Sequence, residues 1–235
     1  MKKIIVLILV VALCATAFTS CELINKLTGG KEGDDTLANV AAMYNMSAPT
    51  KVVATTTQDF GSYELNCNYE LVTGYVDNSL ASVYTVTTEE LRTVEEGGNT
   101  EEVKEMIKST TKKTEAIEGF GARTNGGDWD PAGAVWAIGR GRMAINLDES
   151  AVENVSYENH TLTFVVPAAN VATVLGTDFS AYITGDVEIT IVDDGAVITS
   201  IDLHYHLAGD GANLAESEMT VKVVYTYDLE RITIE

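Results

Sequence analysis

The chain has 235 residues, of which 46% are apolar, and a formal net charge of −20 at pH 7. This apolar content excludes a disordered chain, and the length suits one domain with a sizeable core. A chain this acidic repels nucleic acid and anionic lipid headgroups. We therefore expect no nucleic-acid partner and no binding to a membrane surface through basic residues.

Residues 1–20 have the order of a secretory signal peptide. A basic start, Met1-Lys2-Lys3, is followed by an apolar run from Ile4 to Leu13 and then by mostly small residues. The apolar run is too short to span a bilayer, which takes roughly 20 residues. The segment therefore predicts export from the cytoplasm.

Cys21 directly follows the small residues Thr19 and Ser20. This ending resembles the lipobox of bacterial lipoproteins, although Phe18 stands where that family most often has Leu. The resemblance implies cleavage before Cys21 and diacylglycerol on its thiol. It also implies a lipid anchor in the cell membrane or the outer membrane, with the domain facing the periplasm or the exterior. The alternative is an ordinary secretory signal with Cys21 as a free thiol.

The remaining chain divides into a lipidated tether, residues 21–35, and a single β-rich domain, residues 36–235. The tether is short, charged and contains glycine. Cys14 leaves with the signal and Cys21 is lipidated, so Cys67 has no partner for a disulfide inside the chain. The domain must therefore be held together by packing.

The first half of the domain predicts a helix and then strands. The segment Thr36–Met46 repeats apolar residues at helical spacing and is followed by Pro49. From Tyr63 to Leu71 apolar and polar residues alternate, which is typical of a half-buried strand with Cys67 on its inner face. The segments 51–58 and 80–88 are also strand-like.

The next segments mix helix and strand signals. Thr100 can cap a short helix through Lys108, with acidic residues in its first turn. A strand is predicted over residues 134–147. Residues 152–157 and 161–166 predict a hairpin around Glu158-Asn159-His160.

The C-terminal third is predicted with more regular signals. Pro167–Leu175 reads as a helical turn ending before Gly176. Two strands, over 187–192 and 197–207, flank Asp193-Asp194-Gly195, which is a typical hairpin turn. Alternation from Met219 to Leu229 predicts the final strand.

These elements predict an α+β fold that is mostly β. We expect a curved, half-barrel-like antiparallel sheet covered by the N-terminal helix and one or two short helices. This order of elements, together with the lipobox, resembles the LolA-like lipoprotein-carrier folds. The resemblance implies an open half-barrel that holds acyl chains, but no residue motif carries it, so no binding residue is transferred.

Our leading functional hypothesis is a non-enzymatic lipoprotein that binds an apolar or lipid ligand in the concave face of the sheet. No nucleophile motif is found, so we expect no enzyme activity and no cofactor. The alternative is a structural or protein-interaction lipoprotein, its partner unknown, with a filled core and no ligand. The residues predicted to line the ligand site are Leu65, Tyr69, Leu203, Tyr205, Val223 and Tyr225.

A second candidate site is a group of metal-binding residue types on one strand. Asp202, His204 and His206 alternate onto one face, and two histidines at this spacing can bind one transition metal. The simpler interpretation, which we favour, is an exposed polar strand face.

Overall fold

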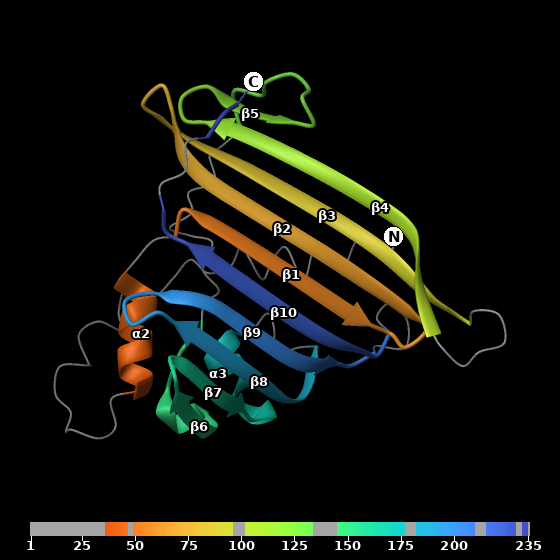
Figure 1. The fold of residues 1–235 in the computed structure, drawn as a ribbon, viewed down its shortest axis with the longest axis vertical. Coiled ribbons are helices and arrows are strands. Elements are labelled where there is room, and N and C mark those ends of the chain that lie inside the picture. Colours follow the sequence, from red (N-terminus) through yellow and green to blue (C-terminus); the bar gives the residue numbers. More distant parts are fainter. Residues whose placement is uncertain are drawn as a thin grey trace.

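The computed structural model describes residues 36–46, 49–95, 102–133, 145–176, 182–209, 215–228 and 232–234. The described residues form a single antiparallel sheet of ten strands and two short helices, α2 (Thr36–Met46) and α3 (Val171–Leu175) (Figure 1). The mostly β fold with few helices is thus confirmed. The predicted signal peptide, Cys21 and the tether lie outside the described residues.

The strand order follows two meanders that meet in the middle of the sheet. The order is β5-β4-β3-β2-β1-β10-β9-β8-β7-β6, so the first and last strands pair centrally (Figure 1). Each strand otherwise pairs with its neighbours in sequence, which needs only short connections. The strands are β1 Lys51–Asp59, β2 Tyr63–Val76, β3 Ser79–Glu95, β4 Glu102–Ile117, β5 Gly121–Thr124, β6 Glu153–Glu158, β7 Thr161–Val166, β8 Ile183–Asp193, β9 Ile198–Leu207 and β10 Ser217–Thr226.

The core lies on one face of the sheet, which we call the inner face. On β10 the odd-numbered residues from Ser217 to Tyr225 are buried, and those between them are mostly exposed, as the alternating sequence predicts. The predicted helical segments cover this face. Leu37 and Val40 of α2 and Val174 of α3 belong to the same apolar cluster as the inward side chains of β7 to β10.

Several predicted elements match the structure closely. The helix Thr36–Met46 has the predicted bounds, and both predicted hairpins form, as β6–β7 and β8–β9. The helical turn after Pro167 is a 3₁₀ turn, Ala168–Asn170, followed by α3, and Gly176 ends it with a positive φ of 95°. Glycine adopts this backbone conformation without a steric penalty.

The predicted helix from Thr100 to Lys108 is wrong. Residues from Glu102 onward belong to β4, which continues to Ile117 and pairs with β3 along its length. Two features override the helical pattern: the β-branched threonines after Lys108, and a long neighbouring strand that satisfies the backbone of β4. A register shift opposite Glu90 and Leu91 absorbs one extra residue of β4.

The strand predicted over residues 134–147 lies mostly outside the described residues. Residues 145–147 are described and are not in a strand. Ile145 and Leu147 instead pack at the edge of the core cluster, and the backbone N–H of Asn146 donates to the Val174 carbonyl beside α3.

Candidate functional site

The strand registers show which side chains share the inner face. Residues directly opposite one another on paired strands point to the same side of a sheet. One such row crosses eight strands and changes from apolar to charged along its course. In order from β7 to β4 it is Leu162, Ile191, Ile201, Val223, Ala54, Tyr69, Val86 and Lys112.

The six predicted ligand-site residues all lie on this inner face. They come from β2, β9 and β10, and the central pairing of β1 with β10 brings these strands near one another. All but Leu65 are buried, at 1–5% exposure, and belong to the core cluster, whereas Leu65 is half-buried. Burial raises the pKa of the Tyr205 phenol above its ordinary value. The buried residues are Tyr69, Leu203, Tyr205, Val223 and Tyr225.

The inner face of β2 and β3 continues the core at partial exposure. Leu71, Tyr84 and Val86 are half-buried apolar side chains that pack against the core cluster. The rings of Tyr69 and Tyr84 stack, with centroids 6.2 Å apart and an interplanar angle of 21°. Both helices lie beside β7 to β9, at the other end of the sheet (Figure 1). This apolar surface therefore extends well beyond the helical cover.

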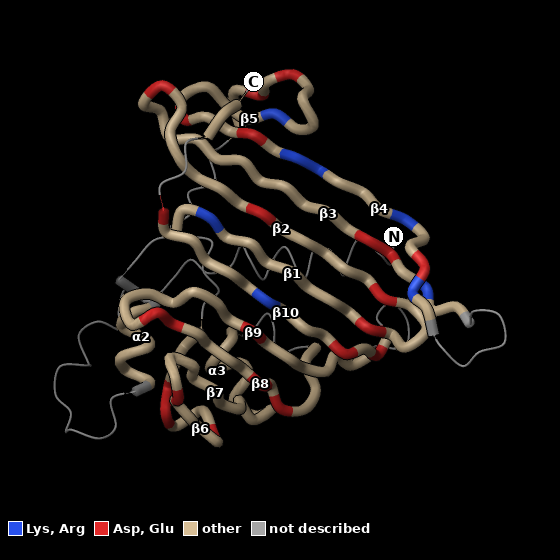
Figure 2. The backbone as a smooth tube through the Cα atoms, in the orientation of Figure 1, with Lys and Arg blue, Asp and Glu red and all other residues tan. Residues whose placement is uncertain are grey.

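The inner face ends on β4 with polar and basic side chains. Lys108, Thr110 and Lys112 lie opposite Glu90, Thr88 and Val86 of β3. Lysines recur along β4 in the described part of this acidic chain (Figure 2). Neither Lys108 nor Lys112 is predicted as a site residue, because a helix is expected up to Lys108 and no element is expected at Lys112. In a strand the alternation of side chains separates Lys112 from its neighbour Lys113, which faces outward.

Glu90 is a buried carboxylate at this polar end of the inner face. It is 8% exposed, and its Oε1 lies 3.9 Å from the Nζ of Lys108, whose side chain is 63% exposed. A buried carboxylate is costly unless positive charge lies near it, so Lys108 has a structural reason to remain close. The side chain of Lys112 makes no hydrogen bond or ion pair with another described residue.

The predicted metal group lies on the opposite, outer face. Asp202 Oδ1 is 3.8 Å from Lys222 Nζ and so does not join the histidines. His206 Nδ1 lies 2.9 Å from Glu218 Oε1, and its Nε2 lies 3.0 Å from Glu216 Oε1. Within the ranges the structure describes, no group of three or more His, Cys, Asp or Glu side chains is arranged to hold a metal ion. The arrangement fits the polar strand face.

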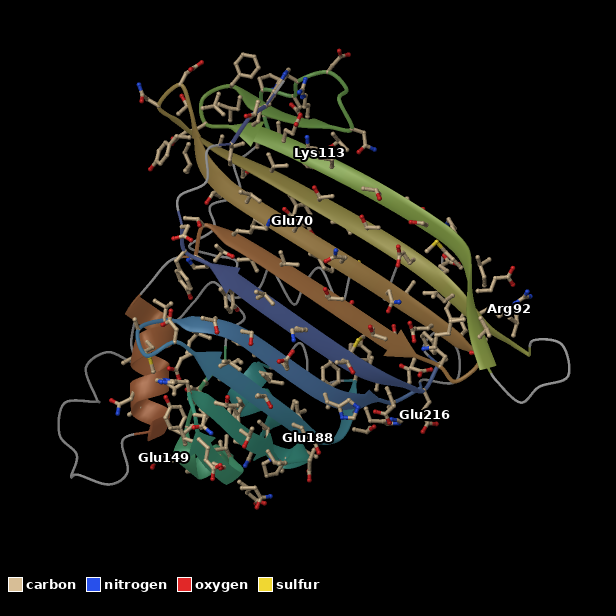
Figure 3. All side chains as sticks on the ribbon, viewed as in Figure 1. Glu70, Arg92, Lys113, Glu149, Glu188 and Glu216 are labelled. Atoms are coloured by element: carbon tan, nitrogen blue, oxygen red, sulfur yellow. The ribbon has the colours of Figure 1, made fainter. Side chains whose placement is uncertain are left out.

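The outer face is polar across the whole width of the sheet. Figure 3 labels Glu70 on β2, Lys113 on β4 and Glu188 on β8 along it. Lys51 Nζ lies 2.9 Å from Glu70 Oε1, and Lys113 Nζ lies 2.7 Å from Glu115 Oε1. Each of these two lysines is thus paired with a carboxylate, Lys51 across to β2 and Lys113 within β4.

Cys67 is a buried thiol, as its place in the alternating strand predicts. It is 3% exposed, and burial raises the pKa of its thiol, while hydrogen bonds with Tyr69 and Thr88 act in the opposite direction. A thiol with a raised pKa is a weak nucleophile at neutral pH. Cys67 therefore serves packing.

Comparisons with known proteins leave the family of this chain open. No protein-family model and no curated protein matches it. Among solved structures it is similar to a porin-like protein from Bacteroides uniformis, at 10% identity and a TM-score of 0.21, over 79% of this chain and 99% of that one. So low a score carries no argument about fold or function. The described helices include none long and apolar enough to cross a membrane.

Proposed function

We propose that this protein is a cell-envelope lipoprotein, anchored through Cys21, that binds an apolar or lipid ligand on the inner face of its sheet. The observation that carries the proposal is the continuation of the apolar inner face beyond the helical cover. Leu71, Tyr84 and Val86 lie on the same face as α2 and α3 but on β2 and β3, toward the other end of the sheet, and they stay half-buried there. Covering such a surface releases about 25 cal/mol per Å² of apolar area.

The ligand surface lies further along the sheet than the sequence predicts. Tyr69, Leu203 and Tyr205 are buried in the core, so they pack beneath the ligand surface and do not contact the ligand themselves. Leu65, Leu71, Tyr84 and Val86 are the inner-face side chains that a ligand would cover. Each methylene of an acyl chain buried there contributes about 0.8 kcal/mol.

The alternative is a structural or protein-interaction lipoprotein that binds no small ligand. Its support is the filled core, since five of the six residues predicted to line a ligand site are 1–5% exposed. In that case the half-buried side chains of Leu71, Tyr84 and Val86 on β2 and β3 pack at the edge of the core and bind no ligand. Binding of a small apolar ligand distinguishes the two functions.

Native mass spectrometry of the full chain carrying Cys21→Ser tests the proposal. The substitution removes the thiol that would carry the anchor's own lipid, so any lipid mass comes from a bound ligand. We expect a lipid-sized mass on protein prepared without detergent, lost on solvent extraction and regained on incubation with lipid vesicles. A bare polypeptide mass after that incubation would favour the interaction protein.

A further inference from the structure

We propose that the ligand is an anionic amphiphile whose acid group lies between Lys108 and Lys112 on the inner face of β4, with its apolar tail along β2 and β3. This inference rests on the proposed function and adds the chemical class of the ligand. It follows from the way the inner face changes character from the centre of the sheet to β4.

Three parallel rows define this change of character. From β2 to β4, one row runs Tyr69–Val86–Lys112, the next Cys67–Thr88–Thr110 and the third Leu65–Glu90–Lys108. Neighbouring strands lie about 4.8 Å apart, so the lysines of β4 are about 10 Å from the apolar residues of β2. An amphiphile lying across the strands meets apolar side chains first and ammonium and hydroxyl groups at its end.

Positive charge exceeds negative charge at this end of the inner face. Lys108 and Lys112 bring two ammonium groups, and Glu90 alone opposes them among the directly facing residues of β3. Lys108 lies near Glu90, whereas Lys112 faces Val86 and has no ion pair among the described side chains. An acid headgroup supplies the missing charge, and the hydroxyl of Thr110 adds a hydrogen-bond donor.

The acidity of the whole chain does not prevent this. Exposed charges are screened beyond about 8–10 Å at physiological ionic strength, so the headgroup responds mainly to its immediate surroundings. At this site those surroundings are β3 and β4, and both lysines of the inner face lie on β4. The overall negative charge instead slows the approach of anions at low salt.

Edge protection is a competing explanation for the lysines of β4. β5 pairs only with Thr114 to Ile117, which leaves the earlier part of β4 without a second neighbour among the described strands. Lysines on such an edge discourage pairing with other chains. That role depends on the edge and not on the face, so it involves Lys112 and Lys113 equally. Ligand binding on the inner face involves Lys112 and not Lys113.

The test compares two probes that share one tail, oleate and oleyl alcohol, on the full chain carrying Cys21→Ser. Isothermal titration below the concentration at which the probes aggregate measures both affinities. We expect oleate to bind about tenfold more tightly than oleyl alcohol, since charge-assisted hydrogen bonds are about twice as strong as neutral ones. The double variant Lys108→Gln/Lys112→Gln should lose this preference and still bind the alcohol.

Two matched variants control the test. Lys113→Gln removes a lysine from the outer face of the same strand and should keep the preference for oleate. Lys108→Arg/Lys112→Arg retains both charges and should also keep it. Circular dichroism and thermal unfolding of every variant show whether the fold is intact.

The outcomes separate this inference from the proposed function. Equal binding of both probes, unchanged in Lys108→Gln/Lys112→Gln, would overturn the anionic headgroup and leave an apolar ligand site. Loss of the preference in Lys113→Gln to the same extent would also overturn it, because the effect would not depend on the face. If neither probe binds, both the inference and the ligand-binding function are wrong.

Discussion

At the scale of single residues, His206 links the stability of the fold to pH. Its two ring nitrogens lie beside Glu218 and Glu216 on the outer face. The hydrogen bond with Glu218 raises the pKa of His206 above its ordinary value, burial acts in the opposite direction, and Glu216 raises it further. A raised pKa in the folded state means that the protonated ring stabilises that state.

We expect this contribution to be fully present below about pH 6.5, the unfolded pKa of histidine, and to be lost as the pH rises through the folded pKa. Other groups titrate as well, so the quantity to measure is the difference in Tm between the wild type and His206→Gln. The wild type should be the more stable near pH 6, with the difference shrinking toward pH 8. A difference that grows with pH would contradict the assignment.

The charged part of the candidate site shows why residue-scale prediction failed there. Lys108 and Lys112 are four positions apart, a spacing that places two side chains on the same face of a helix and also on the same face of a strand, where they are about 13 Å apart. The sequence alone therefore does not show whether this segment is a helix or a strand. Pairing with β3 makes it a strand, and that pairing places Glu90 and Val86 opposite the two lysines. Tyr69 was predictable because its strand alternates clearly.

At the scale of elements, Asp193 joins two hairpins. Its carboxylate accepts hydrogen bonds from the Tyr157 hydroxyl, at 2.9 Å, and from the Gly195 backbone N–H, at 2.7 Å. His160 Nδ1 lies 2.9 Å from the same carboxylate, and the backbone N–H of Asp193 donates to the His160 carbonyl. The turn of β6–β7 is thus fixed to the end of β8 through one buried side chain.

Replacing this carboxylate should destabilise the domain. We expect Asp193→Ala to lower the free energy of unfolding by about 2–3 kcal/mol, because several donors lose a buried acceptor. Tyr157→Phe removes one donor and should cost clearly less. Urea unfolding followed by circular dichroism measures both. Equal midpoints for Asp193→Ala and the wild type would show that the contacts of Asp193 do not hold the hairpins together.

The sequence predicts elements well where one period dominates. The helix Thr36–Met46 and the strand β10 were recognised from their apolar spacing, and the turn at Asp194-Gly195 from its residue types. β4 was not, because Val103, Met106 and Ile107 have helical spacing, whereas the strand state depends on β3. Contacts distant in sequence decide such cases, and no local pattern contains them.

At the scale of the whole molecule, the central pairing of β1 with β10 joins two meanders that each form from local contacts. Thr50 and Thr226, which are hydrogen-bonded here, are 176 positions apart in sequence. β8 and β9 are instead joined by a short turn. Contacts between distant segments form at a high cost in loop-closure entropy, so we expect the β1–β10 pairing to form after the hairpins.

This order of events predicts different kinetic effects for two buried positions. Ile201→Val, in the β8–β9 hairpin, should mainly slow folding, because its contacts are present in the transition state. Val52 lies opposite Tyr225 at the β1–β10 pairing, and Val52→Ala should mainly accelerate unfolding. Stopped-flow measurements in urea separate the two rates. If Val52→Ala slows folding as strongly as Ile201→Val does, the two meanders join early, and the central pair of strands belongs to the folding nucleus.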